Sequence, residues 1–161
     1  MNINKKMLEN IPAWMEKQDD IPVGWAYIGD DKERYLLGQS GAYNLLIFGI
    51  NPSTASVNEN NLDQMTRKVK KIAKAEGYDG WLIVNIYPLR ETDPFKLPRK
   101  PDKDLVENNL KVLEAVEKNY TIGKIWAVWG DSIDTQFYLG DGLYDIQNVI
   151  NSDQCFYRGT N

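Results

Sequence analysis

Continuous apolar runs in this chain alternate with stretches of helical periodicity. The runs at residues 45–50, 81–87 and 124–129 predict buried strands, and a fourth, shorter strand is predicted over 154–157. Strands that are apolar at nearly every position are typical of parallel sheets, because helices cover both faces of such sheets. These four segments therefore predict the centre of the fold.

Helical periodicity separates the predicted strands. Apolar residues recur every three or four positions over 62–76 and 104–118, which predicts two amphipathic helices. A third helix is predicted over 131–139, with Gly140-Asp141-Gly142 as its end. Residues 143–150 fit a helix or a strand equally well. Strands joined by helical crossovers run parallel, so the order favours a parallel β-α-β-α-β-α-β unit.

The N-terminal region has a different pattern. Residues 7–17 predict a short helix, and 25–28 and 35–37 predict two strands joined by the polar turn at 29–32. We interpret this pair as a peripheral hairpin.

These elements predict one α/β domain over residues 1–161. The expected architecture is a three-layer sandwich with a mainly parallel central sheet of about four strands. Residues 1–42 would form the N-terminal helix and hairpin, and residues 43–161 the core.

Composition narrows the possible chemistry. The chain has no histidine, which removes histidine-based catalytic triads and the common zinc sites, and we expect neither a metal nor a cofactor. A net charge of −4 argues against a protein that coats nucleic acid non-specifically, but allows a local basic patch. No apolar run reaches the roughly 18 residues of a membrane span, and no signal peptide is evident. With one cysteine, Cys155, these features predict a cytoplasmic protein.

Polar residues follow each predicted strand. Ligands of open α/β sheets bind at the carboxyl ends of the strands, where the following loops converge. The candidate ligand-binding and catalytic residues at these ends are Asn51, Ser53, Thr54, Asn85, Arg90, Asp93, Asp131 and Ser132. Such residues are also ordinary turn and helix-capping residues, so a structural role stays open for each of them.

Their side chains suggest specific roles. Asn51 could orient a water molecule or contact the edge of a base, and the hydroxyls of Ser53 and Thr54 suit an anion. Arg90 could contact substrate or form a surface ion pair with Asp93. Asp131 could act as a general base in place of histidine, or cap a helix.

The first predicted core helix carries five basic residues opposite its apolar side. They are Arg67, Lys68, Lys70, Lys71 and Lys74. A solvated helix face is the simpler interpretation, and contact with a phosphate backbone is the alternative.

Several segments together resemble a known family. They are RYLL at 34–37, INPSTA at 50–55, GYDGWLIVNIYPLRETDP at 77–94, ENN at 107–109 and WG at 129–130. The combination is similar to the bacterial and phage family numbered 1643 among domains of unknown function. The resemblance covers about residues 34–161. It indicates kinship better than function, since that family has no established activity. It also implies a histidine-containing segment after the last strand, where this chain has Arg158-Gly159-Thr160-Asn161.

A looser similarity extends to the uracil-DNA glycosylase superfamily, through GINPS at 49–53 and the WG pair. That resemblance implies an N-glycosidic hydrolase in which Asn51 positions the attacking water. Asp131 or Asp93 would then stabilise positive charge, and Arg90 would hold phosphate.

Three hypotheses follow. The first is a nucleotide- or nucleic-acid-binding domain, catalytic if the glycosylase similarity extends to mechanism. The second is a non-catalytic protein, such as a phage or mobile-element factor, that binds a host protein. The third is a small-molecule hydrolase with Ser53 as nucleophile, which would need a lysine or carboxylate base.

Overall fold

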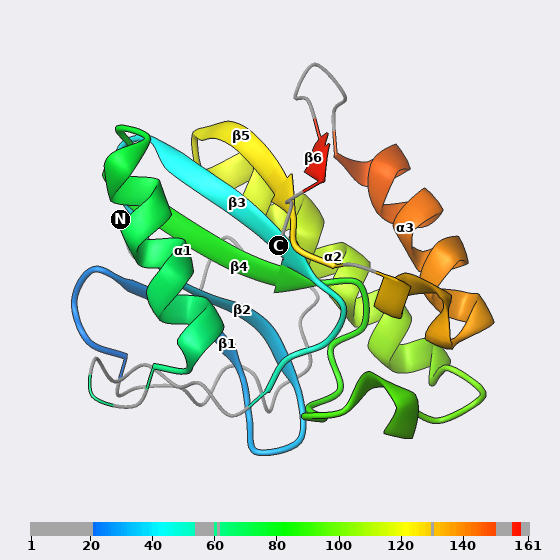
Figure 1. The fold of residues 1–161 in the computed structure, drawn as a ribbon. Helices are drawn as coiled ribbons and strands as arrows, with labels where there is room; N and C mark the ends of the chain where they lie inside the picture. The colour runs from blue at the N-terminus through cyan, green and yellow to red at the C-terminus, as the bar shows by residue number, and fades with distance from the viewer. Residues whose placement is uncertain (1–20, 54–59, 61, 130, 151–155, 159–161) are drawn as a thin grey trace.

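A six-stranded sheet lies at the centre of the computed structural model, which describes residues 21–53, 60, 62–129, 131–150 and 156–158 (Figure 1). The strand order is β1-β2-β4-β3-β5-β6. The strands are β1 (Trp25–Gly29), β2 (Arg34–Gln39), β3 (Asn44–Gly49), β4 (Gly80–Asn85), β5 (Ile122–Ala127) and β6 (Phe156–Arg158). The α-helices are α1 (Gln64–Ala75), α2 (Lys103–Asn119) and α3 (Phe137–Val149), and two short 3-10 helices span Pro94–Lys96 and Asp131–Thr135.

The parallel part of the sheet confirms the main prediction. β3 pairs in parallel with β4 on one side and β5 on the other, and β5 pairs in parallel with β6. Every residue of β3 and β4 is buried, as expected for strands covered on both faces.

The predicted hairpin is not peripheral. β1 and β2 are antiparallel to each other, and β2 also pairs antiparallel with β4. The sheet is therefore mixed and has six strands, instead of a mainly parallel sheet of about four. The physical reason is that β4 would otherwise be an edge strand with unpaired backbone groups. β2 satisfies them while burying Tyr35, Leu36 and Leu37 completely.

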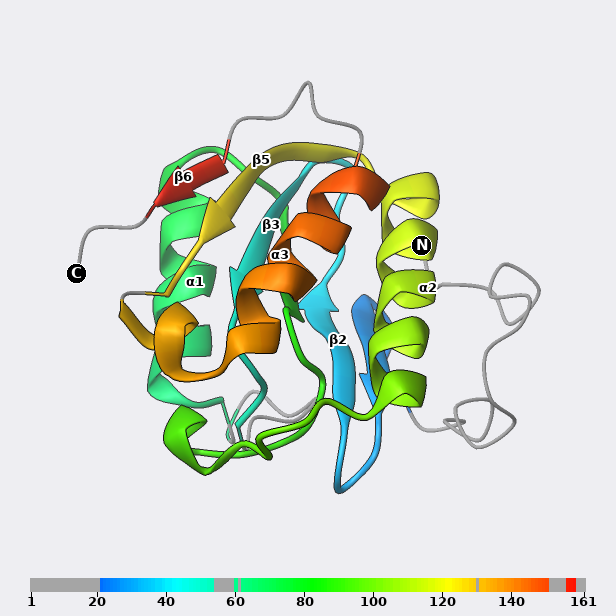
Figure 2. The ribbon, with the colours of Figure 1, turned by 90° about the vertical axis from the view of Figure 1, so that its right-hand side faces the viewer.

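Helices cover both faces of the sheet. α1 lies on one face, and α2 and α3 lie on the other (Figures 1 and 2). The α1 face buries Val69 and Ala73 against Leu45 and Ile47 of β3, whereas the opposite face is the larger apolar cluster. Within the described part of the chain, no helix is long and apolar enough to cross a membrane.

The first two helices lie within two residues of their predicted bounds, 62–76 and 104–118. Asp63 caps α1 by accepting a hydrogen bond from the backbone N–H of Thr66, and Asp102 caps α2. Gly77, with φ of +85°, follows α1 in the left-handed conformation that favours glycine.

The third helix differs from the predicted one at both ends. Gly140-Asp141-Gly142 does not end a helix but lies inside α3, while the predicted helical start at residue 131 is a 3-10 turn. Glycine inside a helix costs only about 1 kcal/mol relative to alanine. Complete burial of Leu139 and near-complete burial of Ile146 offset this cost. The helix predicted over 7–17 lies outside the described residues.

Candidate functional site

The connections that follow the parallel strands determine where a ligand site can form at the edge of the sheet. The loop after β3 leads to α1 on one face, whereas the loop after β5 leads through a 3-10 turn to α3 on the other face. Neighbouring parallel strands whose connections leave toward opposite faces form a switch point, the usual ligand position in α/β sheets. Asn51 and Ser53 follow β3, and Asp131 begins the turn after β5. The structure thus brings these predicted loops to one edge.

Asn51 holds two loops together. Its side-chain Nδ2 donates to the carbonyl oxygens of Glu91 at 2.6 Å, Leu89 at 3.3 Å and Pro52 at 3.3 Å. The backbone N–H of Glu91 also donates to Pro52 O at 3.0 Å. In this structure Asn51 fixes the loop after β3 against the loop after β4.

Arg90 makes a second connection between loops. Its guanidinium donates from Nε to Asp30 O at 2.8 Å, from Nη1 to Ser53 O at 2.9 Å and from Nη2 to the Tyr27 hydroxyl at 2.6 Å. It forms these three bonds instead of the possible ion pair with Asp93. The hairpin turn, the loop after β3 and the loop after β4 are therefore held by one side chain.

Ser53 connects the same loop to the start of α1. Ser53 Oγ donates to Asp63 Oδ2 at 2.5 Å, and Asp63 Oδ1 accepts from Thr66 N at 2.8 Å. Partial burial raises the pKa of the Asp63 carboxyl. Its hydrogen bonds from Ser53 and Thr66, together with the charge of Arg34, lower the pKa by more, so the net shift is downward. The helix N-terminus already holds a carboxylate, which makes this end of α1 a poor site for a ligand anion.

Arg34 is a residue whose position the sequence patterns did not reveal. It is 1% exposed, and burial, followed by the nearby charge of Arg90, lowers its pKa to about 10, so it stays charged near neutral pH. The pairing of β1 with β2 shifts register between Ile28 and Gly29, which opposes Gly29 to Arg34. A charged residue directly before the apolar run Tyr35–Leu37 is the signal in the sequence.

Asn85 is the most unusual predicted residue. It ends β4 and is 1% exposed, yet neither Oδ1 nor Nδ2 of its side chain has a hydrogen-bond partner within the described structure. A Cβ atom at Gly49 would lie 2.7 Å from Asn85 Oδ1, so the glycine makes room for the amide. Buried amides are nearly always hydrogen-bonded, and an exception calls for a physical explanation.

Asn109 of α2 provides a contrast. It is 2% exposed, and its Nδ2 donates to the backbone oxygens of Asn85 at 2.8 Å and Ile86 at 3.2 Å. Asn109 therefore has a structural role at the end of β4 through its Nδ2, although its Oδ1 is also without a partner within the described structure, whereas neither polar atom of the Asn85 side chain has one.

Among the remaining candidate residues, only Asp93 has a side chain within the described structure. Asp93 caps the 3-10 helix Pro94–Lys96, with Oδ1 accepting from Phe95 N at 3.0 Å. Asp131 and Ser132 lie in the turn after β5, but their side chains are outside the described structure, as is the whole of Thr54. Among the described residues, no group of three or more potential metal ligands occurs.

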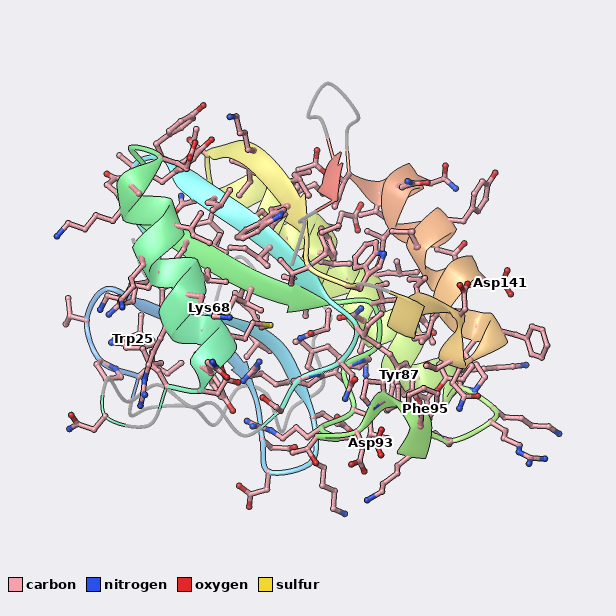
Figure 3. The ribbon with its side chains drawn as sticks, viewed as in Figure 1. Trp25, Lys68, Tyr87, Asp93, Phe95 and Asp141 are labelled. Carbon is pink, nitrogen blue, oxygen red and sulfur yellow. The ribbon has the colours of Figure 1, made fainter. Side chains whose placement is uncertain are left out.

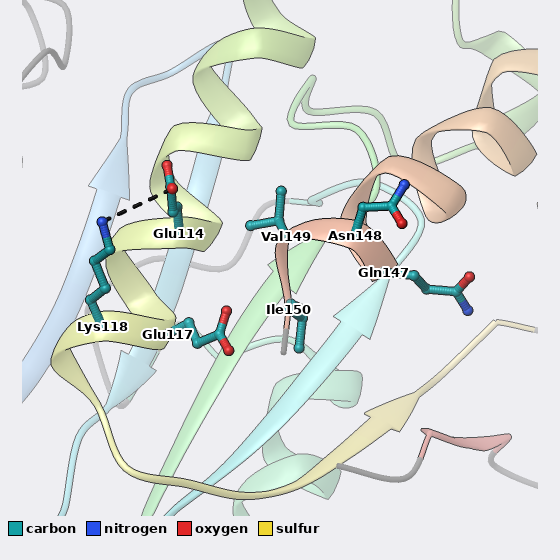
Figure 4. Close-up of a pocket in the computed structure, with 7 residues that line it drawn as sticks. All are labelled: Glu114, Glu117, Lys118, Gln147, Asn148, Val149 and Ile150. Atoms are coloured by element: carbon teal, nitrogen blue, oxygen red, sulfur yellow. Dashed lines mark ion pairs between the residues drawn. The ribbon is translucent and has the colours of Figure 1, made fainter. Parts of the chain in front are cut away.

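A groove of about 570 Å³ lies away from this edge, between the C-terminal ends of α2 and α3 (Figure 4). Its lining residues are Glu114, Glu117, Lys118, Gln147, Asn148, Val149 and Ile150. Since these helix ends precede β5 and β6, the groove lies near the amino ends of the strands. It contains none of the predicted site residues.

The fold and its polar edge define an α/β domain built on a mixed sheet, with a switch point between β3 and β5. The chain belongs to the family described as protein of unknown function (DUF1643), which matches residues 34–156. No curated protein matches the chain. No solved structure matches it either.

Proposed function

We propose that this domain binds a nucleotide or nucleic acid at the carboxyl edge of β3, β4 and β5. The observation that carries the proposal is Asn85, a buried amide at the end of β4 without a partner among the described residues. An asparagine amide offers one acceptor and two donors in fixed geometry, which matches the paired donors and acceptors at the edge of a base. Gly49, which has no side chain, leaves room for the Asn85 amide at this strand end.

The topology supports the same position for the ligand. Asn85 ends the strand next to β3, whose carboxyl end forms the switch point with β5. Because Asn85 is 1% exposed, binding requires that a neighbouring segment moves aside. The energy gained when the amide acquires hydrogen-bond partners would favour that opening.

The hydrolytic part of the uracil-DNA glycosylase similarity has less support than binding. The Asn51 amide nitrogen and the Arg90 guanidinium hold loops together, and Asp93 caps a turn. We therefore propose binding as the function and treat N-glycosidic hydrolysis as an extension with its own test. That test is release of free base from uracil-containing oligonucleotides, followed by chromatography. Release by the wild type that is lost in Asn51→Ala would support the extension, and no release would reject it.

Binding is tested by calorimetry with the nucleoside monophosphates and with short single-stranded and duplex oligonucleotides. Asn85→Leu keeps the approximate shape of the side chain but removes its donors and acceptor, and we expect it to abolish binding. Asn148→Leu, an exposed position on α3, is the matched control and should bind like the wild type. Absence of binding by the wild type, or equal binding by Asn85→Leu, would reject the proposal.

A second candidate is a protein-binding domain, favoured by α3. Phe137 is fully exposed and Tyr144 is 66% exposed on this helix. They are seven positions apart in the sequence, so they lie on the same side of α3. An interaction partner for this surface would be recovered by the wild type and lost with Phe137→Ser and Tyr144→Ser, while nucleotide binding would be absent.

A further inference from the structure

Phe95 is a large aromatic side chain that the fold leaves in solvent. It lies in the 3-10 helix Pro94–Lys96 between β4 and α2, and 75% of it is exposed. Figure 3 shows Phe95 close to Asp93 in this loop. A phenylalanine contributes little to core packing from such a position, and most of its ring is open to contact by a partner.

The turn that carries Phe95 is held firmly. Leu97 is 3% exposed and anchors the turn in the larger apolar cluster. Gln136 Nε2 donates to Leu97 O at 3.2 Å, and the Tyr138 hydroxyl donates to Pro98 O at 2.8 Å. Asp93 caps the turn through Phe95 N. Phe95 is therefore presented by a fixed backbone, which lowers the entropy lost when a partner contacts it.

Four cationic residues lie between positions 96 and 103, in this turn and at the start of α2. They are Lys96, Arg99, Lys100 and Lys103, and all are exposed. The ion pairs found among the described residues are on α2, between Lys111 and Glu107 and between Lys118 and Glu114, and do not involve these four cations. The neighbouring Asp93 and Asp102 direct their carboxylates to backbone N–H groups as caps.

An exposed aromatic ring with several exposed cations close to it in the sequence suits a partner that has both aromatic and anionic groups. A nucleic-acid base can stack on the Phe95 ring, and the phosphates on either side of that base attract the cations. Stacking on the ring requires a base that is not already stacked in a duplex. The start of α1 cannot take the phosphate because Asp63 occupies it. The turn 94–103 follows β4 and so lies at the same edge as Asn85.

We propose that the turn formed by residues 94–103 binds single-stranded nucleic acid, with one base on Phe95 and the flanking phosphates on Lys96, Arg99 and Lys100. This inference rests on the proposed function, and it names single-stranded nucleic acid as the ligand class. The strand would pass over the turn next to the switch point, where Asn85 contacts a base.

The test is fluorescence anisotropy of a labelled oligothymidylate of twelve nucleotides, compared with the same length of duplex and with thymidine monophosphate. Phe95→Ala should weaken oligothymidylate binding roughly 5- to 150-fold, and Phe95→Trp should restore it. Replacing Lys96, Arg99 and Lys100 by glutamine should reduce the slope of log affinity against log salt by about 2. Monophosphate binding should be unchanged in all of these variants.

Two matched controls come from the same chain. Tyr144→Ala removes an exposed aromatic ring from α3, and a Lys111→Gln, Lys118→Gln variant removes ion-paired cations from α2. Both should bind oligothymidylate like the wild type. Circular dichroism of each variant checks that the fold is retained.

The outcomes separate this inference from the proposed function. If the monophosphate binds in an Asn85-dependent way but Phe95→Ala leaves oligothymidylate affinity unchanged, the inference is wrong and the proposed function stands. If oligothymidylate binding depends on Phe95 but not on Asn85, the turn is a binding surface and the switch-point site is wrong. Competition by polyglutamate as effective as that by oligothymidylate, or tighter binding of the duplex, would also overturn the inference.

Discussion

Arg90 and Tyr27 are 63 residues apart in the sequence, and their side chains meet in a hydrogen bond of 2.6 Å from Nη2 to the hydroxyl. The same guanidinium donates to the carbonyl oxygens of Asp30 and Ser53. The first hairpin, the loop after β3 and the loop after β4 therefore have a common connection. The candidate site is built on this connection, so its loops should lose their arrangement when Arg90 is changed.

Arg90→Ala should lower the free energy of unfolding by about 2–3 kcal/mol, because three acceptors lose a charged donor. Arg90→Lys should recover only part of this, since one ammonium group cannot reach all three acceptors. Tyr27→Phe should cost about 1 kcal/mol. Urea unfolding measures each value, and Arg99→Ala, at an exposed position, is the control. Wild-type stability of Arg90→Ala would contradict the structural role.

Asp63 should make stability depend on pH. Its pKa in the folded protein is below the ordinary value of 3.8, so its contribution is fully present above that value and is lost as the pH falls through the lower folded pKa. Asp63→Asn keeps an oxygen for the cap but cannot ionise. The stability difference between wild type and Asp63→Asn should therefore shrink between pH 5 and pH 2 in urea titrations. A difference that stays constant over this range would contradict the prediction.

Asn85 and Asn109 should respond in opposite directions to the same substitution. Asn85→Leu removes an amide without partners in the described structure and should leave the free energy of unfolding unchanged or raise it by about 1 kcal/mol. Asn109→Leu removes the donor to two backbone oxygens and should lower it by about 1–3 kcal/mol. Thermal and urea unfolding would show the contrast. Equal destabilisation by both substitutions would show that Asn85 has a structural partner.

Substitutions at Gly49 and Asn85 should have coupled effects on the free energy of unfolding. Gly49→Ala places a methyl group 2.7 Å from Asn85 Oδ1, which is too close for both to keep their positions, and we expect a cost of about 1–3 kcal/mol. In the double variant Gly49→Ala, Asn85→Ala the clash is absent, so the two effects should not add. A double-mutant cycle measures the coupling. Strict additivity would show that Gly49 is needed for a reason other than space for the amide.

Removing the Asn51 side chain should destabilise the protein less than replacing it with a charged one. Asn51→Ala removes the donor that holds Leu89 and Glu91, at a cost of about 1–2 kcal/mol. Asn51→Asp places a carboxylate against the same carbonyl oxygens and should cost more. Urea unfolding at pH 7 ranks the two variants, and equal stabilities would contradict the assigned hydrogen bonds.

Much of the fold was predictable because its signals are local. The apolar runs that became β3, β4 and β5 reflect burial on both faces, and Asp63 and Gly77 mark the ends of α1 through their own backbone preferences. The local pattern was wrong at Gly140-Asp141-Gly142, where burial of distant side chains outweighed the intrinsic cost of glycine in a helix.

The sequence by itself determined which residues stand at the strand ends, since each follows an apolar run. Only the tertiary structure decided what those residues contact. Pairing of β2 with β4 and the bonds of Arg90 join segments far apart in the chain, and no periodicity encodes such pairs. The same holds for Asn85, whose absence of partners within the described structure depends on which side chains the fold brings around it.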